Sequence, residues 1–156
     1  MESAKAQRVM DELEILRLLA TLAQAVDDRD EARYGACFTD EVIAPFWRPD
    51  SWLAVSSQEY ARRSIEAVSA MTWTHHKLCN PVVDLMGDHA AAKVDVVVDM
   101  EASDSKGRLE HLTIGGRYEL EFARLDQAWR ISKRGLVRRY VVGDPRLADQ
   151  ARRASA

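Results

Sequence analysis

Two adjacent histidines, His75 and His76, lie in the segment TWTHHKLCN, and an aspartate pair, Asp27 and Asp28, ends the first helical pattern of the chain. Consecutive strand residues point to opposite faces of a sheet, so at most one of these imidazoles can face a given cavity. A carboxylate bound to an imidazole fixes its tautomer and raises its basicity, which leaves the second ring nitrogen to take a proton near neutral pH. These residue types therefore indicate general-base chemistry, provided that one histidine meets one aspartate.

Periodicity selects one member of each pair. On a regular strand, His75 shares a face with Lys77, whose side chain is usually solvated, and His76 takes the other face. On the preceding helix, Asp27 continues the apolar stripe and Asp28 continues the polar one. We therefore predict that Asp27 and His76 point inward and are the catalytic residues. The alternative is that Asp27 only binds backbone N–H groups of the next turn and that His76 is a hydrogen-bonded core residue.

The sequence favours no other kind of catalytic centre. Two neighbouring histidines diverge on a strand, so they do not form the two-ligand metal site that a helical i, i+4 pair would form. Cys37 and Cys79 have no metal-ligand spacing, and Cys79 shares the face of His75. The chain has no G-x-S-x-G, phosphate-loop or dinucleotide-binding motif. We expect neither a metal nor a cofactor.

Composition and charge limit the class of protein and of partner. The chain has 156 residues, of which 47% are hydrophobic and 30% charged, as is typical of one globular domain. The net charge of -3 provides no basic field for nucleic acid or a membrane surface, so we expect a small-molecule substrate as the partner. Acidic residues occupy the N-terminus where a secretion signal needs an apolar run, and we therefore expect a cytoplasmic protein.

The order of elements predicts an α+β fold. Residues 8–27 read as a helix with the apolar stripe Leu13, Leu16, Leu19, Ala20 and Ala23. We expect a short second helix capped by Asp30, a third helix over residues 57–70, and long strands over residues 72–86, 89–102, 108–125 and 128–142. Short turns between these strands indicate antiparallel hairpins. Three N-terminal helices thus pack on a strongly curved, mostly antiparallel sheet that encloses a pocket, in a single domain over residues 1–156 with a core over about 8–142.

Two further features bear on the predicted pocket. Gly115 and Gly116 lie in the middle of a strand and indicate a bulge or a sharp bend there. Trp47, Trp52 and Trp73 lie near the transition from helices to sheet. They are either core and interface residues or the apolar wall of a ligand pocket, and Trp47 is our candidate for substrate binding.

Several short motifs, in their order, resemble the SnoaL-like branch of the nuclear transport factor 2-like superfamily. They are VDDRDE, HKLCN and the run IGGRY…E…RLD…W…SK, within a resemblance that covers roughly residues 8–147. The resemblance is greatest to the scytalone dehydratase and hexachlorocyclohexane dehydrochlorinase group. It implies a cone-shaped α+β barrel in which an aspartate and a histidine abstract a proton so that water or halide leaves. The matching positions are Asp27 and His76, and the resemblance also implies a homo-oligomer, either a dimer or a trimer.

The resemblance also suggests residues that bind substrate and limits the reaction. His75 matches a histidine doublet, and Arg124 matches the family's R-x-D stretch on the same strand face as Tyr118, so all three are predicted to bind substrate. The dehydrochlorinase lysine near Leu22 is missing, which favours dehydration or isomerisation of a small, largely apolar cyclic substrate. The alternatives are a non-catalytic ligand-binding or assembly module of the same fold, or a small structural subunit of a ring-hydroxylating dioxygenase.

Overall fold

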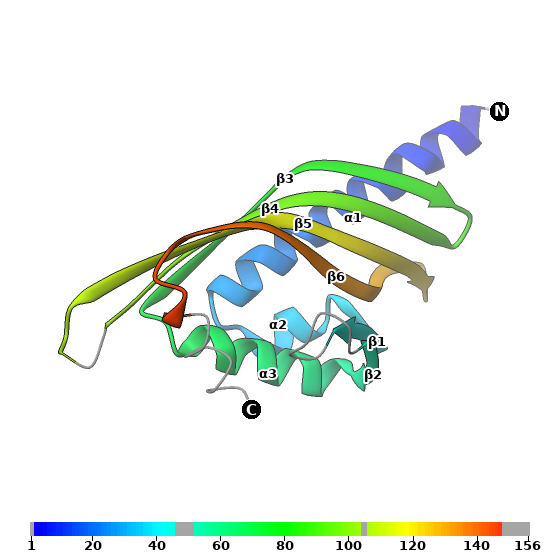
Figure 1. Ribbon diagram of the computed structural model, residues 1–156. Helices are drawn as coiled ribbons and strands as arrows, with labels where there is room; N and C mark the ends of the chain where they lie inside the picture. The colour runs from blue at the N-terminus through cyan, green and yellow to red at the C-terminus, as the bar shows by residue number, and fades with distance from the viewer. Residues whose placement is uncertain (1, 46–51, 104–105, 148–156) are drawn as a thin grey trace.

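The computed structural model describes residues 2–45, 52–103 and 106–147 (Figure 1). The helices are α1 (Glu2–Asp27), α2 (Glu31–Gly35) and α3 (Ser57–Ser69), and the strands are β1 (Phe38–Pro45), β2 (Trp52–Ser56), β3 (Trp73–Met86), β4 (His89–Ser103), β5 (Leu109–Leu125) and β6 (Ala128–Gly143). Each helix and long strand predicted from the sequence is present. Trp47, one of the predicted substrate-binding residues, lies outside the described residues.

The six strands form one curved sheet in the order β2-β1-β6-β5-β4-β3. Neighbouring strands are antiparallel except for β1 and β6, which are parallel. The sheet remains open because β2 and β3 are its two edges, and Figure 1 shows it bent, with α1 along the long strands and α2 and α3 together below them. The prediction of three helices on a curved, mostly antiparallel sheet is therefore confirmed, with an open cone in place of a closed barrel.

Side-chain caps fix the starts of the two later helices. The Asp30 carboxylate accepts a hydrogen bond of 3.0 Å from the backbone N–H of Arg33 at the start of α2. The Ser56 hydroxyl accepts one of 3.2 Å from the backbone N–H of Glu59 at the start of α3. Each cap satisfies an N–H group that has no partner inside the helix. The sharp turn at Arg29, whose φ is 57°, then directs the chain from α1 into α2.

The buried stripe of α1 differs from the predicted one. The fully buried positions Ile15, Leu19, Leu22 and Val26 are spaced three or four residues apart, as expected for one helix face. Leu13 is instead 55% exposed, and Ala20 is also exposed, so the stripe centre is rotated away from them. Asp27 follows Val26 and lies at the edge of the buried stripe. No described helix has the length and apolar character needed to cross a lipid bilayer.

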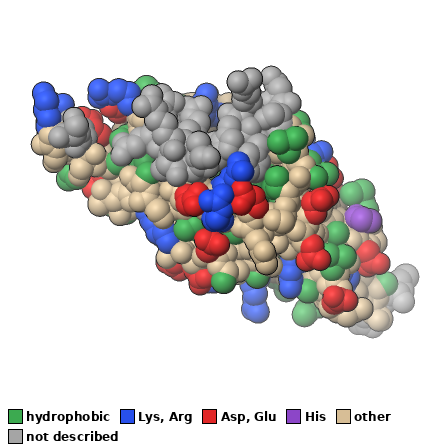
Figure 2. Space-filling view, turned by 90° about the horizontal axis from the view of Figure 1, so that it is seen from below, with side chains coloured by type: hydrophobic (Ala, Val, Ile, Leu, Met, Phe, Trp, Pro, Cys, Tyr) green, Lys and Arg blue, Asp and Glu red, His purple; other side chains and the backbone are tan. Residues whose placement is uncertain are grey.

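The helical side of the molecule is covered with charges of both signs. Seen from below, acidic and basic side chains lie next to one another there (Figure 2). On α3, Arg62 pairs with Glu59 and Glu66 at helical spacings of three and four residues. Exposed pairs of this kind contribute little to stability, because solvent screens the two charges. The packing of the apolar faces of α1 and α3 against the sheet therefore holds these helices in place.

Candidate active site

Asp27 and His76 meet where the end of α1 contacts the start of β3. The imidazole Nδ1 of His76 lies 2.7 Å from Oδ1 of Asp27, and the backbone N–H of His76 donates a hydrogen bond of 2.8 Å to Oδ2. Both side chains are largely buried, with 11% of His76 and 17% of Asp27 exposed. The two residues selected from the sequence thus form one hydrogen-bonded pair.

The other partners of Asp27 determine the tautomer of His76. The Thr74 hydroxyl donates a hydrogen bond of 2.9 Å to Oδ1 of Asp27. Burial would raise the pKa of the Asp27 carboxyl, but hydrogen bonds from the His76 side chain and backbone, with that from Thr74, outweigh it and hold this pKa below its usual range. An ionised carboxylate only accepts hydrogen bonds, so Nδ1 of His76 carries the proton and donates it. In the neutral imidazole, Nε2 then has a free lone pair, as a general base requires.

The lowered pKa of Asp27 predicts how stability changes with pH. A carboxyl whose pKa is lower in the folded state stabilises the protein fully above its unfolded pKa of about 3.9, and this contribution disappears as pH falls through the folded value. The free energy of unfolding of the wild type, minus that of Asp27→Asn, should therefore shrink as pH falls from about 5 to 3, a range below the titration of a free histidine, in which the carboxyl is the group that changes. Urea unfolding at these pH values measures the difference. An increase over this acidic range would contradict the assignment.

Arg29 joins the three segments that meet at the pair. Its guanidinium donates hydrogen bonds to the Asp27 carbonyl at 2.5 Å, to the Val68 carbonyl at 3.1 Å and to the Thr74 hydroxyl at 3.3 Å. It therefore links the end of α1, the end of α3 and the start of β3. Because Thr74 accepts from Arg29 while it donates to Asp27, this network orients the carboxylate that holds His76.

His76 forms part of the wall of a small cavity between α1, α2, α3 and the sheet. The cavity has a volume of about 140 Å³. Its lining residues are Leu22, Ala23, Val26, Tyr34, Ser64, Val68, His76, Leu78, Tyr118 and Arg134. Because Nδ1 of His76 is engaged by Asp27, Nε2 is the nitrogen that remains available to a ligand in this cavity. The site thus combines a base with mostly apolar walls and a few polar groups, as is typical of small-molecule sites.

Arg134 is the cation of this cavity, and the sequence reading missed it. Its Nη1 donates a hydrogen bond of 2.7 Å to the Tyr60 hydroxyl, and its Nη2 donates one of 2.5 Å to the Tyr118 hydroxyl. The guanidinium lies over the Tyr118 ring, 4.2 Å from its centroid. Tyr118, which was predicted to bind substrate, does line the cavity and holds this arginine in place.

A bulge explains why alternation along β6 does not identify Arg134. Trp129 and Ile131 are buried, so strict alternation would place Lys133 inside and Arg134 outside. The register between β5 and β6 shifts, however, because Phe122 pairs with Ile131 while Glu121 pairs with Lys133. The extra residue on β6 reverses the faces, and Arg134 then lies opposite Leu120, a buried residue.

His75 and Arg124, both predicted to bind substrate, do not line this cavity. His75 is exposed on the outer face of the sheet, where it lies opposite Asp99 of β4. The Arg124 guanidinium binds Asp11 at 2.6 Å and Asp88 at 3.1 Å, and it lies 4.6 Å from the centroid of the Trp129 ring. The strand directs His75 outward, and Arg124 fastens α1 to β5, so neither residue lies at this cavity as predicted.

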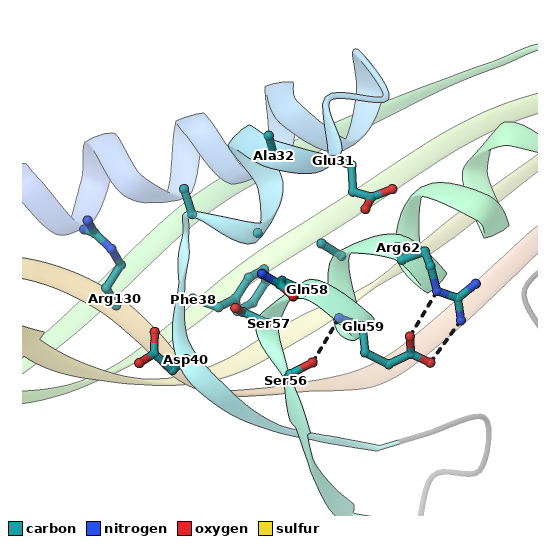
Figure 3. A pocket seen from close by; sticks show the side chains of 13 residues that line it. Glu31, Ala32, Phe38, Asp40, Ser56, Ser57, Gln58, Glu59, Arg62 and Arg130 are labelled. Carbon is teal, nitrogen blue, oxygen red and sulfur yellow. Dashed lines mark hydrogen bonds and ion pairs between the residues drawn. The ribbon is translucent and has the colours of Figure 1, made fainter.

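A larger surface groove, about 930 Å³ in volume, lies between α2, α3 and β1 (Figure 3). Its acidic and basic side chains include Glu59, Arg62 and Arg130, and Figure 3 shows Glu59 bound to Arg62. Hydrogen bonds from Arg62 and Arg63 lower the pKa of Glu59 to about 2, so this carboxylate is a poor base. The smaller cavity at His76 is therefore the better candidate site. Within the described ranges, no three His, Cys, Asp or Glu side chains form a group that could hold a metal ion.

Comparison with known families identifies the fold family. Residues 7–135 match the family described as the SnoaL-like domain. The chain belongs to the SnoaL-like domain family. The match covers most of this SnoaL-like chain, including Asp27, His76 and Arg134, and it confirms the resemblance inferred from the sequence motifs. No curated protein matches the sequence.

Solved structures similar to this SnoaL-like protein include several relatives at low identity. The Kfla4162 protein from Kribbella flavida is 22% identical with a TM-score of 0.83, over 91% of this chain and 99% of that one. A scytalone dehydratase-like protein from Novosphingobium aromaticivorans is 14% identical with a TM-score of 0.76, over 92% of each chain. Hexachlorocyclohexane dehydrochlorinase LinA-type3 from Novosphingobium barchaimii LL02 is 19% identical with a TM-score of 0.73, over 90% and 94%. These similarities show a shared fold.

Proposed function

We propose that this protein is a lyase that removes water from a small cyclic compound, with His76 as the general base and Asp27 as the residue that orients it. The observation that carries the proposal is the hydrogen bond of 2.7 Å between His76 and an ionised Asp27 at the wall of a small cavity. A structural histidine would need no cavity beside its free nitrogen. The dehydratase-like and dehydrochlorinase relatives make elimination the favoured reaction class.

The proposed step begins at a carbon whose proton is activated by a neighbouring carbonyl. Nε2 of His76 takes this proton, and the electron pair of the broken C–H bond forms a C=C double bond. The C–O bond of a β-hydroxyl breaks at the other carbon, and the imidazolium returns its proton to the departing oxygen, so that one water leaves and His76 is regenerated. Asp27 stabilises the transient imidazolium, since it stays ionised beside Nδ1. In an isomerase, the same imidazolium would return the proton to a different carbon.

A panel of hydroxylated cyclic ketones and their unsaturated products tests this proposal. Wild-type protein is incubated with each compound, and loss of water is followed by the absorbance of the new conjugated double bond. Turnover of at least one compound that depends on His76 is the expected result. Binding of the compounds without any turnover would favour the alternative of a ligand-binding module of the same fold.

A further inference from the structure

We propose that the substrate of this cavity carries a carboxylate, and that Arg134 and the hydroxyl of Tyr118 bind it. This inference rests on the proposed function for the identity of the reacting site, but its own observations are the charge, the hydrogen-bond donors and the size of the cavity. It names a substrate class: a monocyclic acid whose ring lies between the acid group, at Arg134, and the base His76.

The charge of Arg134 is unbalanced at the cavity surface. A guanidinium stays protonated at every physiological pH. None of the ten lining residues, all of which belong to the described part of the chain, is Asp or Glu. Burial raises the pKa of Tyr34 well above its ordinary value, so this tyrosine remains neutral. Asp27 lies behind His76 and is already engaged by three hydrogen bonds. A buried cation without a close counter-ion is costly, and a bound anion would remove this cost.

The hydrogen-bond donors of Arg134 are also incompletely used. Of the five N–H groups of a guanidinium, one reaches the Tyr60 hydroxyl and one reaches the Tyr118 hydroxyl. The buried Nε has no hydrogen-bond partner in the described structure. Because the Tyr118 oxygen accepts from Arg134, its own O–H proton is free to donate to a ligand. The guanidinium and the phenol together thus offer donors suited to a carboxylate, whose two oxygens only accept.

The size and walls of the cavity favour a single ring. Apolar cavities of about 150 Å³ bind molecules the size of benzene, and this cavity measures about 140 Å³. Leu22, Val26, Val68 and Leu78 provide an apolar surface for such a ring. His76 and Arg134 both line the same small volume, so one six-membered ring with an acid group can contact both. The volume therefore favours one ring over several.

Binding of benzoate and of its neutral analogue benzamide to the wild-type protein tests the inference. Both probes have the same ring, but only benzoate is an anion at pH 7. By titration calorimetry we expect benzoate to bind at least about tenfold more tightly than benzamide, because charge-assisted hydrogen bonds are roughly twice as strong as neutral ones. In spectra of the protein labelled with ¹⁵N-histidine, benzoate should shift the signals of His76 and leave those of the exposed His75 unchanged. Equal affinities, or no shift of His76, would overturn the proposal.

Two matched substitutions on β6 test whether Arg134 binds the carboxylate. Arg134→Gln should lower the affinity for benzoate by at least about tenfold and leave that for benzamide within about threefold. Arg138→Gln, which removes an exposed arginine of the same strand, should change neither. Unchanged benzoate affinity in folded Arg134→Gln would overturn the proposal. If Arg134→Gln does not fold, the wild-type comparison of benzoate with benzamide still decides the question.

His76→Ala distinguishes an error in the carboxylate site from an error in the general base. His76→Ala should keep the preference for benzoate over benzamide, since Arg134 remains in place. An anion preference that depends on Arg134, together with turnover that survives His76→Ala, would reject the base and retain the carboxylate site. Turnover that depends on His76, together with equal affinities for the two probes, would reject the carboxylate site and retain the base.

Discussion

Replacing His76 by alanine is expected to lower kcat/KM for any compound that the wild type dehydrates by about 10²–10⁴-fold, the usual contribution of a general base. The substitution removes the imidazole that lines the cavity and that Asp27 binds at Nδ1. Initial rates measured with the active members of the ketone panel give the ratio. The main effect should fall on kcat, because the cavity walls that bind the ring remain.

The adjacent histidine provides a matched control. His75 has the same side chain but is exposed on the opposite face of β3. His75→Ala should therefore keep kcat/KM within about threefold of the wild type, provided that both variants show the same cooperative unfolding. Turnover by His76→Ala equal to that of the wild type would reject His76 as the base. Equal losses in the two variants would point to a general effect on the fold.

Replacing Asp27 by asparagine should lower kcat by about 10²-fold or more while the imidazole stays in place. Asp27 accepts hydrogen bonds from Nδ1 and from the backbone N–H of His76, one at each oxygen. Asparagine has only one acceptor oxygen, so its amide N–H₂ must face one of these donors. If it faces the imidazole, the proton moves to Nε2 and the lone pair in the cavity is lost. The same panel, assayed for kcat and KM separately, measures this effect.

Asp28 is the matched control for Asp27, because it is the next residue and is exposed. It pairs with Arg33 at 3.4 Å in a solvated position, so Asp28→Asn should leave kcat essentially unchanged. A loss of activity in Asp28→Asn as large as that in Asp27→Asn would show that the effect comes from the loss of one negative charge at the end of α1, and not from the contact with His76. Full activity in Asp27→Asn would show that His76 needs no carboxylate partner.

Alternation along β3 predicted the orientation of the two adjacent histidines because this part of the strand is regular. Positions from Trp73 to Cys79 pair in an unbroken register with β4, and the irregularity begins only after Cys79. His75 and His76 therefore lie on opposite faces, as the two-residue period requires. Asp27 was selected by the same kind of reasoning on a helix, although the buried stripe of α1 is centred on Ile15, Leu19 and Leu22.

The cationic part of the site could not be predicted in this way. A bulge in β6 is a property of the paired strands, and no residue type in the segment WRISKR marks it. The match to the R-x-D stretch predicts Arg124, and not Arg134, as a residue that binds substrate. The Arg124 guanidinium is nevertheless held by Asp11 of α1, and a contact between residues 113 positions apart leaves no local pattern in the sequence. The volume and walls of the cavity likewise depend on six elements that meet only in the folded chain.

The central claim is that Asp27 holds His76 with a free Nε2 in the cavity, and ¹⁵N spectra of the histidine side chains test it most directly. The protein is labelled with ¹⁵N-histidine, and the two ring nitrogens of His76 are assigned by comparison with His76→Ala at pH 7.5. We predict a protonated Nδ1 and an unprotonated Nε2 in the wild type, with this preference weakened in Asp27→Asn. A wild-type His76 with the proton on Nε2 would contradict the account, because that nitrogen could not then accept a proton from a substrate.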